Sequence, residues 1–330
     1  MTSESRLVHI VDEIPELEAV TDLTMVLVLD GFLDAGNSAA LACRYLTEVS
    51  AGQTGVMVGR ESTSGSSGSV VATFDVDQFH DYRARRPPMS FVGDHYADYE
   101  APRLVVRLMR DSADIPYLLM HGPEPDNRWE AFARAVREVI ERFDVSRVVG
   151  MGSVPMAVPH TRPIAITHHA NNNALISGDS PWRGELRIPS SAQALLEVRL
   201  GEWGHDGLGY VAHIPHYLAQ LDYPRASVAL LEQVELGGHL TIDLTGLRES
   251  ADEREEDVTR YLAANEEIAD VVRALEQQYD SFEEAEESGR SLLADDTPLP
   301  TGDEIGQQFE QFLAGLDEDR PDSTRNPEDD

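Results

Sequence analysis

The chain contains no lysine: all 26 basic residues in its 330-residue sequence are arginine. Enzymes that form a Schiff base on a lysine side chain are therefore excluded. A Walker-type nucleotide loop is excluded as well, because its lysine binds the β- and γ-phosphates.

Cysteine is almost absent and long apolar runs are wholly absent. The single cysteine, Cys43, cannot form an internal disulfide, which suits a reducing compartment. No stretch of about 18 apolar residues could cross a membrane. The first residues carry neither the basic flank nor the apolar segment of a signal peptide. We therefore expect a cytoplasmic protein.

Positive charge is scarce. Sixty acidic residues oppose the 26 arginines, for a formal net charge of -34. A field of this sign repels phosphate backbones and anionic lipids, so we expect neither nucleic acid nor a membrane surface as partner. The acidic residues crowd towards the end of the chain. We expect a core domain over residues 1–248, an acidic helical extension over 249–316 and a disordered acidic tail over 317–330.

Short apolar runs alternate with amphipathic stretches through the expected core domain. Residues 23–30 (LTMVLVLD) predict a strand buried on both faces. Residues 126–143 repeat apolar side chains every three or four positions, as in a helix with one buried face. Helical stretches at 37–49, 191–203 and 227–236 alternate in the same way with apolar runs. This order predicts a three-layer α/β/α fold with a mainly parallel sheet, followed by a C-terminal helical extension.

Two polar segments interrupt this alternation. Residues 75–91 (DVDQFHDYRARRPPMSF) are broken by two prolines, and residues 168–173 (HHANNN) predict a loop. The first segment holds Arg83, Arg85 and Arg86, a basic island on an acidic chain. These arginines either bind an acidic partner or neutralise nearby carboxylates.

The stretch LVLDGFLDAGNSAAL over residues 27–41 predicts a strand, a glycine turn and the start of a helix. Free backbone N–H groups at such a helix start suit an anion, which makes Asp34, Gly36 and Asn37 candidate ligand-binding residues. The glycine spacing does not match a dinucleotide fingerprint. Alternatively, Asp34 caps the helix and the segment is a structural turn.

A second candidate lies in PHTRPIAITHHANN, over residues 159–172. Pro159 and Pro163 bracket His160 and Arg162, which indicates a stiff connection. The segment follows the glycine-rich end of an expected strand, where open α/β sheets bind ligands. A structural role and a ligand contact are both open for His160 and Arg162.

No arrangement typical of catalysis is present. There is no GxSxG nucleophile elbow and no HExxH helix. His168 and His169 would point to opposite faces of an extended segment, and Pro215 separates His213 from His216. We therefore assign no catalytic, cofactor-binding or metal-ligating residues.

Four segments in this order resemble the proteasome assembly chaperone 2 family, in its actinobacterial branch: DGFLDAGNSAAL, FDVDQFHDYRARRP, HGPEPDNRW and PHTRPIAIT. The resemblance covers roughly residues 7–236. It implies a core like that of nucleoside phosphorylases and hydrolases, with self-association, a trimer among the arrangements. Relatives that dock on proteasomes end in a hydrophobic-Tyr-X tail, whereas this chain ends Asn-Pro-Glu-Asp-Asp, which puts docking by the tail in doubt.

Two functions follow as hypotheses. The first is a non-catalytic binding or assembly protein that acts through protein–protein contacts, with proteasome subunits as partners. The second is a phosphorylase- or hydrolase-like enzyme with a nucleoside-type ligand. In that case Asp34, Gly36, Asn37, His160 and Arg162 would line a small-molecule site at the carboxyl ends of the strands.

Overall fold

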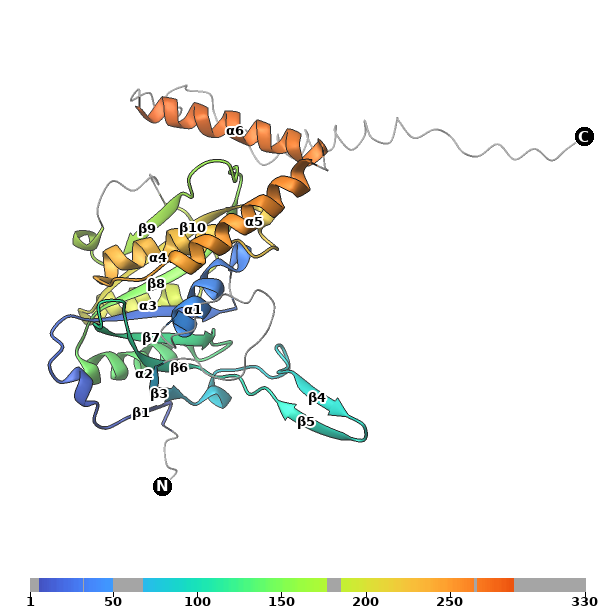
Figure 1. The fold of residues 1–330 in the computed structure, drawn as a ribbon. Helices are drawn as coiled ribbons and strands as arrows, with labels where there is room; N and C mark the ends of the chain where they lie inside the picture. Colours follow the sequence, from blue (N-terminus) through green and yellow to red (C-terminus); the bar gives the residue numbers. More distant parts are fainter. Residues whose placement is uncertain (1–5, 32, 50–67, 177–184, 264–265, 288–330) are drawn as a thin grey trace, which may run out of the picture. The chain divides into compact units, whose positions relative to one another are not determined.

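The computed structural model describes residues 6–31, 33–49, 68–176, 185–263 and 266–287 (Figure 1). Eight strands form one sheet in the order β1-β3-β6-β7-β2-β8-β10-β9. Their bounds are β1 Val8–Ile10, β2 Leu23–Asp30, β3 Ser69–Phe74, β6 Val105–Arg110, β7 Pro116–Pro123, β8 Val145–Met156, β9 Ile166–Ala170 and β10 Asp206–Pro215. The four central strands β7, β2, β8 and β10 run parallel, and the flanking strands pair antiparallel. The α/β class is confirmed, with its parallel pairing concentrated in the middle of the sheet.

Helices cover both faces of this sheet. Their bounds are α1 Ser38–Val49, α2 Trp129–Phe143, α3 Ala192–Trp203, α4 Pro224–Gly238, α5 Thr245–Ala263 and α6 Glu266–Glu287. Successive residues of β2 point to opposite faces, as in any strand. Met25 and Leu27 pack with buried residues of α2 and α3, whereas Val26 and Val28 pack with those of α1 and α4. Residues 23–29 are apolar except for Thr24 because both faces of β2 are covered.

The chain divides into two compact units, Met1–Gln277 and Gln278–Asp330. The first unit takes in α5, whose Leu247, Ala251 and Val258 are buried. Of the second unit only the end of α6 is described. The division expected after residues 248 and 316 stays a prediction, and residues 288–330 lie outside the described part. None of the described helices combines the length and the apolar character that crossing a bilayer requires.

The polar segment 75–91 ends in the first strand of a separate hairpin, β4 Met89–Val92 with β5 His95–Tyr99. Gly93 turns the chain between the two strands with φ of 63°. The expected loop at residues 168–173 begins with strand, since β9 includes His168 and His169 and pairs antiparallel with β10. Pairing with β10 outweighs the polar character of these histidines.

Candidate functional site

Asp34 lies at the carboxyl end of the sheet, between β2 and α1, and its carboxylate caps the helix. The two carboxylate oxygens accept hydrogen bonds from the backbone N–H groups of Ala39 and Ala40, at 2.9 and 3.0 Å. The Ser153 hydroxyl, on neighbouring β8, donates to the same carboxylate at 2.8 Å. A helix N-terminus is stabilised by a nearby negative charge, and here the Asp34 carboxylate supplies that charge.

Gly36 and Asn37 join this turn to the segment that precedes α4. Gly36 donates to the Ala219 carbonyl, and Tyr223 donates to the Gly36 carbonyl, both at 2.8 Å. Gly36 has φ of 69°, and a Cβ there would lie 2.9 Å from Cβ of Tyr223. Both the left-handed backbone and the lack of space therefore require glycine at this position. The Asn37 side-chain amide donates to Asp222 at 2.6 Å.

His160 follows β8 and is buried against Tyr217 of the short helix η5 (His216–Leu218). The Tyr217 hydroxyl accepts from the His160 backbone N–H at 2.9 Å and lies 2.7 Å from Nδ1 of the ring. Burial lowers the pKa of His160 and raises that of Tyr217 to about 12. A neutral His160 can accept at Nδ1 the proton that the Tyr217 hydroxyl donates, so both groups are satisfied.

Arg162 points to helix α6 through an ion pair with Glu276 at 3.5 Å. Glu276 also accepts a hydrogen bond from the Thr161 hydroxyl. Arg225, in the first turn of α4, donates to the His160 carbonyl at 3.3 Å and pairs with Glu255 of α5. The connection after β8 is thus tied to α4, α5 and α6.

The structure therefore links the two groups of candidate residues through one segment, residues 216–225. That segment contacts Gly36 and Asn37 on one side and His160 on the other. The polar groups of Asp34, Asn37 and His160 named above each bond to protein groups. Their role in binding a ligand stays a prediction.

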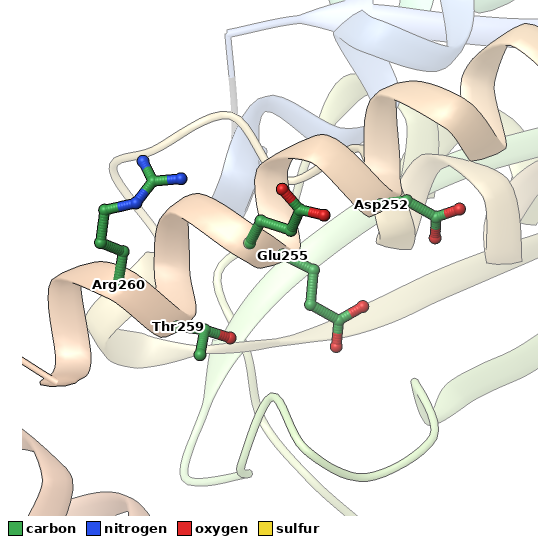
Figure 2. A pocket seen from close by; sticks show the side chains of 5 residues that line it. Asp252, Glu255, Thr259 and Arg260 are labelled. Atoms are coloured by element: carbon green, nitrogen blue, oxygen red, sulfur yellow. The ribbon is translucent and has the colours of Figure 1, made fainter.

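An open surface hollow of about 410 Å³ lies beside α5, where Glu255 pairs with Arg225. Its described lining comes from that one helix and includes Asp252, Glu255, Thr259 and Arg260 (Figure 2). Its described wall is mostly acidic, which suits a positively charged group better than a phosphate. Nowhere in the described residues do three or more His, Cys, Asp or Glu side chains gather as metal ligands.

A second polar cluster escaped the sequence analysis. Arg85 of the basic island lies across the carboxyl ends of β2 and β7. Its guanidinium pairs with Asp126 at 2.8 Å and donates to the carbonyls of Asp30 and Glu124. The Glu124 carboxylate accepts from the Ala192 N–H at the start of α3, at 2.6 Å. Burial raises the pKa of Glu124.

This cluster lies where the sheet changes the direction of its connections. The chain leaves β2 for α1 on one face and leaves β7 for α2 on the other, and such a crevice is the usual ligand position in open α/β sheets. Here Arg85 occupies it. The motifs DYRARRP, which holds Arg85, and HGPEPDNRW, which holds Asp126, meet at this point. Both motifs are visible in the sequence, but only the fold shows that they are in contact. Arg85 thus neutralises carboxylates, as one of the two readings of the basic island proposed.

The fold and these contacts define an α/β protein whose strand ends are closed by interactions between its own loops. The sequence profile of the PAC2 family matches residues 28–262, and the chain belongs to this family. The proteasome assembly chaperone resemblance is thereby confirmed.

Solved structures show similar chains. The chain is 40% identical to the Mycobacterium tuberculosis unknown function protein Rv2714, with a TM-score of 0.76 over 86% of this chain and 94% of that one. A protein of unknown function from Corynebacterium glutamicum is 30% identical, with a TM-score of 0.73 over 84% and 97%. Rv2125, a proteasome-assembly chaperone homologue of Mycobacterium tuberculosis, is 25% identical, with a TM-score of 0.65 over 76% and 100%. No curated protein matches the chain.

Proposed function

We propose that this chain is a non-catalytic assembly protein that acts through protein–protein contacts, with proteasome subunits among its partners and with copies of itself. The partner class is supported by the likeness to Rv2125, which is described as a proteasome-assembly chaperone homologue. The mode of action is supported by the contacts at the strand ends, where the candidate polar groups are used within the protein. One structural feature carries the proposal: the β4–β5 hairpin.

The hairpin is a two-stranded sheet that extends from the main sheet (Figure 1). It exposes large apolar side chains. Phe91 and Tyr96 are 61% and 75% exposed, and their rings meet edge to face at 5.2 Å. Met89, Val92 and Tyr99 are exposed as well. A lone two-stranded hairpin is at best marginally stable in water, and exposed aromatic clusters are typical of protein interfaces. A partner that covers both strands would stabilise the hairpin.

We take that partner to be a second copy of the chain. Arg83 and Arg86 lie a few residues before β4, are exposed, and form no ion pair among the described residues. A chain with a net charge of -34 offers acidic surface to these arginines in every copy of itself. A contact between the hairpin and another copy would thus bury Phe91 and Tyr96 and would pair the arginines that precede β4 with acidic groups of that copy.

Self-association is tested by measuring the mass of the full chain in solution, by light scattering after size exclusion. We expect an oligomer that dissociates when Phe91→Ser and Tyr96→Ser are combined. The matched control is Leu236→Ser, which removes an isolated apolar side chain that is 71% exposed on α4. A wild-type monomer, or dissociation by the control as well, would contradict the role of the hairpin.

The partner class is tested separately. Tagged chain, mixed with lysate of a proteasome-bearing actinobacterium, should retain proteasome subunits, identified by mass spectrometry. Recovery of none by a folded chain would count against the assembly function.

The enzyme hypothesis remains the alternative, because the candidate residues lie at the carboxyl ends of the parallel strands. Only this hypothesis expects specific thermal stabilisation by a nucleoside with phosphate. The capping carboxylate of Asp34 disfavours a phosphate at that helix start, since the two negative charges would repel each other.

A further inference from the structure

A groove runs between helices α1 and α5, with the start of α4 at one end, and encloses about 210 Å³. From α1 it is lined by Leu41, Arg44, Tyr45 and Glu48, whose spacing places them on one side of the helix. From α5 it is lined by side chains that include Leu247 and Glu253. The space is smaller than the usual range for drug-sized ligands and suits a single small metabolite.

The floor of this α1–α5 groove is apolar. Leu41, Tyr45 and Leu247 are all buried, and the Tyr45 hydroxyl is already satisfied by the Asp243 carbonyl at 2.6 Å. An aliphatic chain of a few carbons could lie on these side chains and be removed from water. The floor therefore favours a ligand with a methylene body.

The rim carries three charged side chains, Arg44, Glu48 and Glu253, that make no side-chain hydrogen bond or ion pair among the described residues. They offer two carboxylates and one guanidinium to a ligand.

The other charged groups of the groove are engaged. Asp222 accepts from Asn37 at 2.6 Å, the Arg254 guanidinium donates to the Asp222 carbonyl at 2.9 Å, and Asp257 pairs with Arg260 at 2.9 Å. This contrast separates the three available charges from the surrounding acidic surface.

We propose that the α1–α5 groove binds a free basic amino acid. The α-carboxylate of such a ligand would pair with Arg44, its two cationic groups would pair with Glu48 and Glu253, and its methylene chain would lie on the floor. Two positive charges and one negative charge on the ligand complement one positive and two negative charges on the rim. The proposal is independent of the assembly function.

Isothermal titration of the full chain tests this, with L-arginine, agmatine and L-leucine as probes. Agmatine is arginine without its carboxylate, and leucine lacks the second cation. Because each loses one charge-assisted contact, we expect each to bind about tenfold more weakly than arginine. Arg44→Gln should weaken the binding of arginine until its affinity equals that of agmatine, and it should leave the affinity of agmatine unchanged.

Glu253→Gln should weaken both arginine and agmatine about tenfold, since each would lose a contact to a cationic group. The matched control is Glu256→Gln, which removes an exposed carboxylate of the same helix that does not line the groove. Melting curves of all variants would verify that they are folded. No binding of arginine, equal affinities for arginine and agmatine, or an equal effect of Glu256→Gln and Glu253→Gln would overturn the proposal.

Discussion

Replacing Asp34 with alanine distinguishes the capping role of this residue from a ligand-binding role. The substitution removes the acceptors of two N–H groups in the first turn of α1 and one of the acceptors of Ser153. Loss of an N-terminal cap costs about 1 kcal/mol, and loss of the charge at the helix start costs about 0.5 kcal/mol. The Ser153 hydroxyl keeps its bond to the Ala35 carbonyl at 2.8 Å, so it is not left unsatisfied.

The sum for Asp34→Ala is therefore about 1.5 kcal/mol of unfolding free energy, which corresponds to a melting temperature lower by about 3–6 °C for a domain of this size. Urea unfolding followed by tryptophan fluorescence measures the loss directly. Asp34→Asn keeps an acceptor and loses the charge, so we expect about half of the effect. If Asp34→Ala leaves the stability unchanged, Asp34 is not a cap that matters to the fold, and its free carboxylate would again be a candidate for ligand contact.

Three further predictions concern buried groups. Burial lowers the pKa of His121 to about 4, so the unfolded state takes up a proton first as the pH falls from about 6.5. Stability should thus fall by up to about 3 kcal/mol between pH 6.5 and 4, and His121→Gln should flatten this dependence in urea titrations at several pH values. Gly36→Ala should lower stability by about 2 kcal/mol in urea unfolding, because φ is positive and the new methyl would press on Tyr223; an unchanged midpoint would refute the close contact. Tyr217→Phe removes the hydroxyl that is bonded to His160 and should cost about 1–2 kcal/mol of unfolding free energy, which lowers the melting temperature by about 2–8 °C.

Local patterns in the sequence were sufficient for the elements of the core. The near-continuous apolar run that predicts residues 23–30 as a strand becomes β2 with the same bounds, since such a run is typical of a strand buried on both faces. The three- or four-residue period at 126–143 becomes α2, which begins at Trp129 because Arg128 has a left-handed backbone. In both cases the signal lies within one element.

The hairpin and the cluster around Arg85 could not be predicted from local sequence patterns. Strand β4 presents exposed side chains at every position, so it has no alternation of apolar and polar residues to mark it. Arg85 and Asp126 are 41 positions apart and meet because β3, which precedes Arg85, and β7, which precedes Asp126, both flank β6 in the sheet. A sequence shows which residues are available for such a contact, but the pairing of strands decides which of them meet.

The same reasoning explains why the contacts that the candidate residues at the strand ends make within the protein could not be predicted. Gly36, Asn37 and His160 all bond to the segment at residues 216–225, which shows no pattern beyond one proline and two tyrosines that could reveal this role. Once that segment lies at the carboxyl end of the sheet, its contacts with these residues help to stabilise that end. The groups that we propose to meet other molecules lie at the hairpin and at the rim of the α1–α5 groove, where Arg44, Glu48 and Glu253 have no partner within the part of the chain that is described. These two places are therefore the first to test for recognition, and ligand binding at Asp34, His160 and Arg162 stays a prediction.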